Sequence, residues 1–156
     1  MAKPQFTLAP VNPLHSADAL ELIRELDEYL LKLYPSENVY ILDLSSLSAK
    51  NGLFLVGYLA GRPVACGAVV KLAAGVGEIK RLYVRPEARG QGLAKRMMAR
   101  LEDEARQMGL PTLRLESGNR QPESLALYLR LGYRRIPNFG EYIGDPHSVC
   151  MEKTLD

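Results

Sequence analysis

One stretch decides the fold: residues 77–98, which read GEIKRLYVRPEARGQGLAKRMM. Its first part, Ile79–Val84, is rich in β-branched, aromatic and aliphatic residues and predicts a strand. Pro86 ends that strand, because proline has no N–H to donate to a neighbouring strand. Beyond a tight turn, apolar residues recur with the 3.6-residue period of a helix, at Leu93, Met97, Met98, Leu101, Ala105 and Met108.

The turn between strand and helix, Arg89–Ala94, has the composition of an anion-binding site. Its two glycines let the backbone approach a ligand closely and expose free N–H groups. A helix N-terminus carries partial positive charge, which favours a phosphate or pyrophosphate, and Arg89 adds a formal charge. The turn is not a P-loop. It is not Gly-x-Gly-x-x-Gly either, because Lys95 stands where the third glycine would be.

The other elements follow from apolar patterning and from helix caps. Ser16 is a favourable N-cap for a helix that ends at Tyr34, because Pro35 pushes the preceding residue out of the helical region. Residues 35–50 are weakly patterned, with a short helix at 41–47 or a plain surface connection as alternatives. Strands are expected at 6–11, 53–59, 64–70, 78–84, 113–115, 133–136 and 148–151, and further helices at 92–109 and 122–131.

The order strand, helix, strand over residues 78–115 predicts a crossover that makes strands 78–84 and 113–115 parallel. The N-terminus of the intervening helix then lies at the carboxyl ends of both strands. Ligands bind at that edge in open α/β sheets. The hairpin turns near residues 60–63 and 73–77 predict that strands 53–59, 64–70 and 78–84 form an antiparallel meander.

Length and composition favour one domain spanning residues 1–156, of ordinary globular type, with 47% apolar and 24% charged residues. A net charge of +2 gives no support for nucleic acid or a membrane as partner. The two cysteines suggest free thiols in a reducing, cytoplasmic compartment. The two histidines, His15 and His147, are too far apart in sequence to suggest a metal site.

Two motifs of the sequence resemble motifs of the GNAT superfamily of N-acetyltransferases. Arg89-x-x-Gly92-x-Ala94, after a strand that ends Leu82-Tyr83-Val84, is similar to the acetyl-CoA motif of that family. The segment Leu127-Tyr128-x-x-Leu131-Gly132-Tyr133 resembles a second block, with Tyr133 in place of the usual Phe. A glycine-containing turn of any α/β domain is the alternative interpretation of the first motif.

The resemblance implies an α/β (α+β) fold with a mixed, mostly antiparallel sheet of six to seven strands and about four flanking helices. Strands four and five of this sheet would be parallel and splayed. It also implies acetyl-CoA as co-substrate without a metal, and pairing through the last strands as a possible homodimer. The residues expected at the cofactor are Leu82, Tyr83, Val84, Arg89, Gly90, Gln91, Gly92, Leu93, Ala94, Lys95 and Asn119.

Acetyl transfer to an amine needs a neutral amine and a protonated leaving thiol, so a proton acceptor and a proton donor are expected. Glu78 is the candidate acceptor, because six strand steps of ~3.3 Å separate it from the phosphate turn, about the length of a pantetheine arm. The alternative for Glu78 is a structural role as a solvated glutamate at the hairpin. Tyr128 is the candidate proton donor, and the alternative for it is packing in the core. Candidate acceptor-substrate contacts are Tyr34, Tyr142 and His147.

The function expected from these features is transfer of an acetyl group from acetyl-CoA to a primary amine of a small molecule or protein. A non-catalytic acyl-CoA-binding or sensing module is the alternative. The cofactor turn is intact and both candidate catalytic residues, Glu78 and Tyr128, are present, which favours the enzyme. A nucleic-acid-binding domain is disfavoured by the near-neutral charge.

Overall fold

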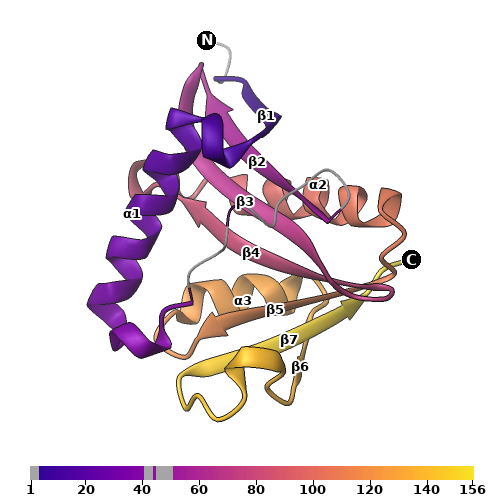
Figure 1. Cartoon of the computed structure of the whole chain (residues 1–156). Coiled ribbons are helices and arrows are strands. Elements are labelled where there is room, and N and C mark those ends of the chain that lie inside the picture. Colours follow the sequence, from indigo (N-terminus) through magenta and orange to yellow (C-terminus); the bar gives the residue numbers. More distant parts are fainter. Residues whose placement is uncertain (1–3, 41–43, 45–50) are drawn as a thin grey trace.

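The computed structural model describes residues 4–40, 44 and 51–156, which form a seven-stranded sheet with helices on both faces (Figure 1). The strand order is β1-β2-β3-β4-β5-β7-β6. The helices are α1 (Ala17–Leu33), α2 (Leu93–Gln107) and α3 (Pro122–Arg130). The strands are β1 (Phe6–Val11), β2 (Gly52–Leu59), β3 (Arg62–Ala73), β4 (Val76–Val84), β5 (Thr112–Gly118), β6 (Arg134–Ile136) and β7 (Ser148–Thr154).

The sheet is mixed and mostly antiparallel, as predicted. β4 and β5 pair in parallel, and the other pairings between the described strands are antiparallel. About four flanking helices were expected, and the described residues contain three α-helices and several 3-10 turns. The short helix expected over residues 41–47 lies, apart from Leu44, outside the described residues.

Helix α1 covers one face of the sheet. The Ser16 hydroxyl caps it by accepting the N–H of Ala19 at 3.1 Å, and the helix ends at Tyr34, as its cap and the following proline predict. Its Leu22 and Leu26 pack against side chains of β2, β3 and β4 in one core cluster. This places the middle of α1 beside the later part of β4, and its C-terminal end beside the segment that follows β5 (Figure 1).

Helices α2 and α3 contribute to the larger core cluster on the opposite face of the sheet. From α2, Met97, Met98 and Leu101 are fully buried there, at the helical spacing seen in the sequence. Each such side chain contributes roughly 1.5–3 kcal/mol by leaving water. From α3, Tyr128 belongs to the same cluster.

Strand β5 is longer than predicted. Residues 113–115 were expected, and the strand runs from Thr112 to Gly118. The reason is its pairing with β7, which continues through Ser117↔Val149 and Gly118↔Ser148. A long-range partner therefore holds residues of low β-propensity in a strand, and β5 carries Glu116 along with it.

Candidate active site

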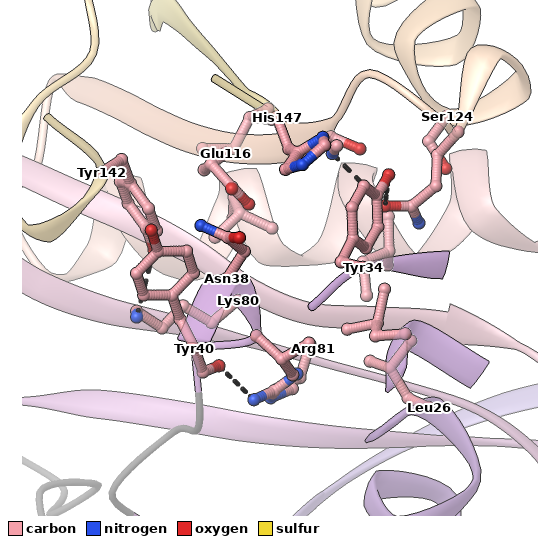
Figure 2. A pocket seen from close by; sticks show the side chains of 18 of the residues that line it. Leu26, Tyr34, Asn38, Tyr40, Lys80, Arg81, Glu116, Ser124, Tyr142 and His147 are labelled. Atoms are coloured by element: carbon pink, nitrogen blue, oxygen red, sulfur yellow. Dashed lines mark hydrogen bonds between the residues drawn. The ribbon is translucent and has the colours of Figure 1, made fainter. Parts of the chain in front are cut away.

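A cavity of about 100 Å³ opens where β4 and β5 separate. The parallel pairing runs from Val76↔Thr112 to Ile79↔Leu115, and β4 and β5 continue beyond it without pairing to each other. The predicted splay is therefore present. Residues 79–82 and 115–118 line the cavity together with α3 and residues from the end of α1 through Tyr40 (Figure 2). Elements from both faces of the sheet thus meet in one space.

On the β4 side, the wall is a β-bulge centred on Arg81. Lys80 pairs with Ala68 and Tyr83 with Cys66, so two residues of β4 oppose Gly67. Arg81 has a left-handed φ of 57°, which costs a non-glycine residue of order 1 kcal/mol or more. Its guanidinium lies 3.0 Å from Asp27 of α1 and donates to the carbonyl of Tyr40. These contacts hold the bulge in place.

On the β5 side, Glu116 is the first residue beyond the last β4–β5 pair, and it lines the cavity. The Ser148 hydroxyl donates to its Oε2 at 2.6 Å. Burial, joined by repulsion from Asp145 and Glu78, raises the pKa of Glu116 to about 7, although the hydrogen bond from Ser148 lowers it. Sequence reasoning missed this residue. The alternation of Leu113, Leu115 and Ser117 on one side with charged residues on the other was the signal.

Glu78, the predicted proton acceptor, lies opposite Arg114 in the paired part of the two strands, two strand positions before the level of Glu116. Its side chain is buried, and its Oε2 accepts the Tyr142 hydroxyl at 2.5 Å. The Lys80 Nζ is 3.7 Å away. Burial raises the pKa of Glu78 despite Lys80 and Tyr142. Tyr142 lines the cavity and Glu78 does not, so Glu78 is connected to the cavity through that hydroxyl.

Tyr128, the predicted proton donor, projects from α3 into the cavity wall and is 7% exposed. Its ring packs edge-on against Tyr133 with centroids 6.0 Å apart. Burial, with a smaller contribution from Glu116, raises its pKa above the ordinary value of a tyrosine. Tyr128 is thus both a core residue and a cavity residue.

The three predicted acceptor contacts, Tyr34, Tyr142 and His147, all line the cavity. Figure 2 shows Glu116 between two aromatic pairs, Tyr40 with Tyr142 on one side and Tyr34 with His147 on the other. The ring centroids of these pairs are 4.8 Å and 5.7 Å apart, in edge-on geometry. The His147 Nδ1 is buried and has no hydrogen-bond partner among the described residues. A polar group in the cavity would satisfy it.

The cavity wall includes Gln121 but not Asn119, which was expected at the cofactor. Asn119 is exposed, donates to the carbonyls of His147 and Pro146, and does not line the cavity. Gln121 lines it and accepts the Tyr34 hydroxyl at 3.2 Å. The two residues are only two positions apart, and sequence alone could not tell which one turns inward.

The predicted phosphate turn has an open backbone at the start of α2. Gly90 and Gly92 have φ of 83° and 75°, and a Cβ at either would meet open space. Gly92 is the N-cap of α2 and has no side chain to accept a hydrogen bond. The first N–H groups of α2 therefore have no side-chain acceptor at the N-cap. Arg89 is exposed beside the turn and donates from Nε to the carbonyl of Val84 at 2.9 Å. This arrangement fits a pyrophosphate.

The other predicted cofactor residues divide into two groups. Leu82 lines the cavity, and Gln91 and Lys95 are exposed around the turn. Tyr83, Val84 and Leu93 are buried in the core, and Ala94 is partly buried. The buried ones are available to a ligand through their main chain more than through their side chains. The described residues contain no cluster of side chains suited to a metal, and no described helix is long and apolar enough to cross a membrane.

Known proteins that are similar to this chain are acetyltransferases. Residues 19–133 match the model of the acetyltransferase (GNAT) family. The chain is 44% identical over 153 residues to the IAA acetyltransferase of Azospirillum brasilense, covering 97% of this chain and 99% of that protein. A crystal structure of a candidate acyl-CoA N-acyltransferase from Klebsiella pneumoniae matches with TM-score 0.84 and 38% identity, over 97% and 99% of the two chains.

At lower identity, 16%, the fold is shared with the PaiA N-acetyltransferase of Thermoplasma acidophilum, solved in complex with coenzyme A. The TM-score is 0.71, and the match covers 97% of this chain and 99% of that one. The splayed β4–β5 pair, the open turn before α2 and the family match over most of the sequence agree. The chain belongs to the acetyltransferase (GNAT) family.

Proposed function

We propose that this chain transfers the acetyl group of acetyl-CoA to the primary amine of a small molecule held in the β4–β5 cavity. Family membership makes the chain an acetyl-CoA-dependent N-acetyltransferase. The observation that carries the proposed acceptor is the cavity itself, which aromatic side chains and a carboxylate enclose at the point where the two strands part. Its volume of about 100 Å³ suits an amino group on a short chain.

The charges around the cavity favour a cationic acceptor. Asp145, Glu78 and Lys80 lie close enough to Glu116 to act on its charge, while the positive charge of Arg81 is offset by Asp27 at 3.0 Å. Negative charge is therefore in excess when the carboxylates are ionised. The rings nearby offer faces and edges that an ammonium group can contact.

The turn before α2 is the proposed site of the pyrophosphate of acetyl-CoA, which when bound supplies an activated acetyl carbonyl to the amine. The N–H groups of residues 91–94 would hold the phosphates and Arg89 would add charge-assisted hydrogen bonds. Gly90 and Gly92 leave the space in front of these N–H groups open. The main chain of residues 82–84 would lie along the cofactor arm.

For Tyr128 we propose a hydrogen bond to the departing sulfur. Tyr128 is one of the residues that line the cavity. Burial raises its pKa, which makes complete proton release less favourable, so the bond would act by strengthening as charge builds on sulfur. A homodimer and a cytoplasmic location stay predictions.

The test measures binding and chemistry separately. Acetyl-CoA should raise the melting temperature, and free thiol should appear when an amine from a panel is added: spermidine, tyramine, phenethylamine, amino acids and aminoglycosides. IAA is included because of the name of the Azospirillum relative. Stabilisation without thiol release for any of them would favour the non-catalytic acyl-CoA-binding alternative.

A matched pair of variants tests the turn. Gly92→Ala places a methyl group before α2 at a φ of 75°, and Gly109→Ala does the same after α2 at a φ of 73°, both in open space. Each costs similar backbone strain, roughly 1–2 kcal/mol. Stabilisation by acetyl-CoA should therefore be lost in Gly92→Ala and kept in Gly109→Ala. Equal stabilisation of both variants would contradict the cofactor site.

A further inference from the structure

We infer that Glu116, and not Glu78, is the residue that takes the proton from the acceptor amine. The inference rests on the proposed function and deepens it. It assigns a catalytic role to a residue that the sequence motifs did not single out, and it gives the Glu78–Tyr142 pair a positioning role.

The two glutamates lie on either side of the point at which β4 and β5 stop pairing. Glu78 is opposite Arg114, where main-chain hydrogen bonds still close the sheet, whereas Glu116 follows Leu115, the last β5 residue paired with β4. Glu116 lines the cavity and Glu78 does not. A proton acceptor has to come within hydrogen-bond reach of the amine, so geometry favours Glu116.

The partners of the two carboxylates differ as well. Glu78 has a hydroxyl donor at 2.5 Å and the Lys80 ammonium at 3.7 Å. No Lys or Arg of the described residues lies within 4 Å of Glu116, which accepts one hydrogen bond, from Ser148 to Oε2. No described residue donates a hydrogen bond to its Oε1. A partly buried carboxylate without a cation is the partner that an incoming ammonium group requires.

The surroundings suit proton transfer in both directions. Tyr128 lines the same cavity from α3, so the proposed donor and acceptor of protons face one space from different elements. Burial places the pKa of Glu116 at about 7, close to the pH at which an enzyme of this kind would work. The titratable and charged groups around Glu116 are Glu78, Lys80, Tyr128, Asp145 and Cys150, and the cavity is also lined by Tyr34, Tyr40, Arg81, Tyr142 and His147.

The proposed reaction transfers the acetyl group from sulfur to nitrogen. One proton moves from the ammonium nitrogen to Oε1 of Glu116, and the freed electron pair on nitrogen forms the bond to the acetyl carbon. The carbon–sulfur bond breaks with its electron pair going to sulfur. The second proton on nitrogen leaves to solvent, sulfur gains one with the help of Tyr128, and Glu116 returns its proton to solvent. The net release is one proton for each amide formed from an ammonium ion.

The experiment compares three variants of the whole chain, using the panel amine with the highest rate of thiol release. In the wild type, kcat/KM should rise through an acid limb near pH 7. Glu116→Gln should lower kcat/KM by about a hundredfold or more at pH 7 and remove that limb. The loss should shrink as the pH approaches the pKa of the amine, near ~10.4 for an alkylamine.

The other two variants separate catalysis from positioning. Ser148→Ala keeps the carboxylate and removes the hydrogen bond that lowers its pKa, so it should keep the acid limb and move it to higher pH. Glu78→Gln should keep the limb and lower kcat/KM by less than tenfold. Stabilisation by acetyl-CoA must persist in all three, which shows that each still folds.

Two results would overturn the inference. If Glu116→Gln keeps the wild-type limb while Glu78→Gln loses it, Glu78 is the proton acceptor. If neither variant changes the limb, the amine loses its proton to solvent. Absence of thiol release from the wild type with every panel amine is a different failure, because it refutes the proposed acceptor class and with it the basis of this inference.

Discussion

Replacing Glu116 by glutamine should make the protein more stable, and increasingly so as the pH rises. The glutamine keeps the shape of the side chain and its carbonyl can still accept the Ser148 hydroxyl. It removes a carboxyl whose pKa is raised by burial from 4.5 to about 7. Below pH 4.5 this carboxyl is protonated in both the folded and the unfolded chain. The wild type and the variant should then differ little.

The magnitude follows from linkage between protonation and folding. Between pH 4.5 and 7 the unfolded chain loses the proton of Glu116 while the folded chain retains it, so the wild type loses stability. At about 1.36 kcal/mol for each pKa unit, the rise from 4.5 to about 7 amounts to at most about 3 kcal/mol. Partial exposure reduces this, so we expect roughly 1–3 kcal/mol, constant above pH 8.

Urea unfolding followed by circular dichroism at pH 4.5 and pH 8 measures the effect. The matched control is Asp145→Asn. Burial tends to raise the pKa of Asp145, but hydrogen bonds from the Tyr40 hydroxyl and the His147 N–H outweigh it, and the pKa is lowered. Asp145→Asn should therefore destabilise most at neutral pH and less in acid. A difference between Glu116→Gln and wild type that does not change with pH would refute the reasoning.

Three further changes have distinct expected outcomes. Tyr128→Phe keeps the packing and should lower kcat by roughly a hundredfold in the thiol-release assay, with acetyl-CoA binding by calorimetry unchanged. Gly118→Ala would place a Cβ 1.8 Å from the Tyr34 hydroxyl, so displacement of that ring should raise the acceptor KM without affecting acetyl-CoA. Glu102→Gln breaks a buried pair with Lys153 at 3.0 Å and should cost roughly 3 kcal/mol of unfolding free energy in urea.

The features that the sequence could predict are local. The cap at Ser16, the end of α1 before Pro35 and the glycine turn before α2 each depend on a few adjacent residues. The order of strands and helices was likewise predictable, because the spacing of apolar residues within each segment indicates its type. The parallel pairing of β4 and β5 was also predictable, because a crossover through a helix brings two strands together in that direction.

The features that it could not predict depend on partners distant in sequence. Ser117 and Gly118 become strand residues because β7 pairs with them, and this moves Glu116 from an expected loop to the edge of the opening. The bulge at Arg81 is held by Asp27 and Tyr40, from segments about 40 residues or more away. No periodicity in β4 indicates such contacts. Glu78, the carboxylate chosen from sequence, therefore lies two strand positions before the level of Glu116.

The splay of β4 and β5 gives the sheet two more edges in its middle. Unpaired main-chain groups along a strand normally invite another chain to add a strand, and proteins protect their outer edges against aggregation for this reason. Here the inner edges are only a few residues long, and α3 and Tyr34 lie across the opening between them. A strand of another chain would have to displace these side chains in order to pair there. The fold can thus keep hydrogen-bonding groups available at its centre without becoming prone to self-association.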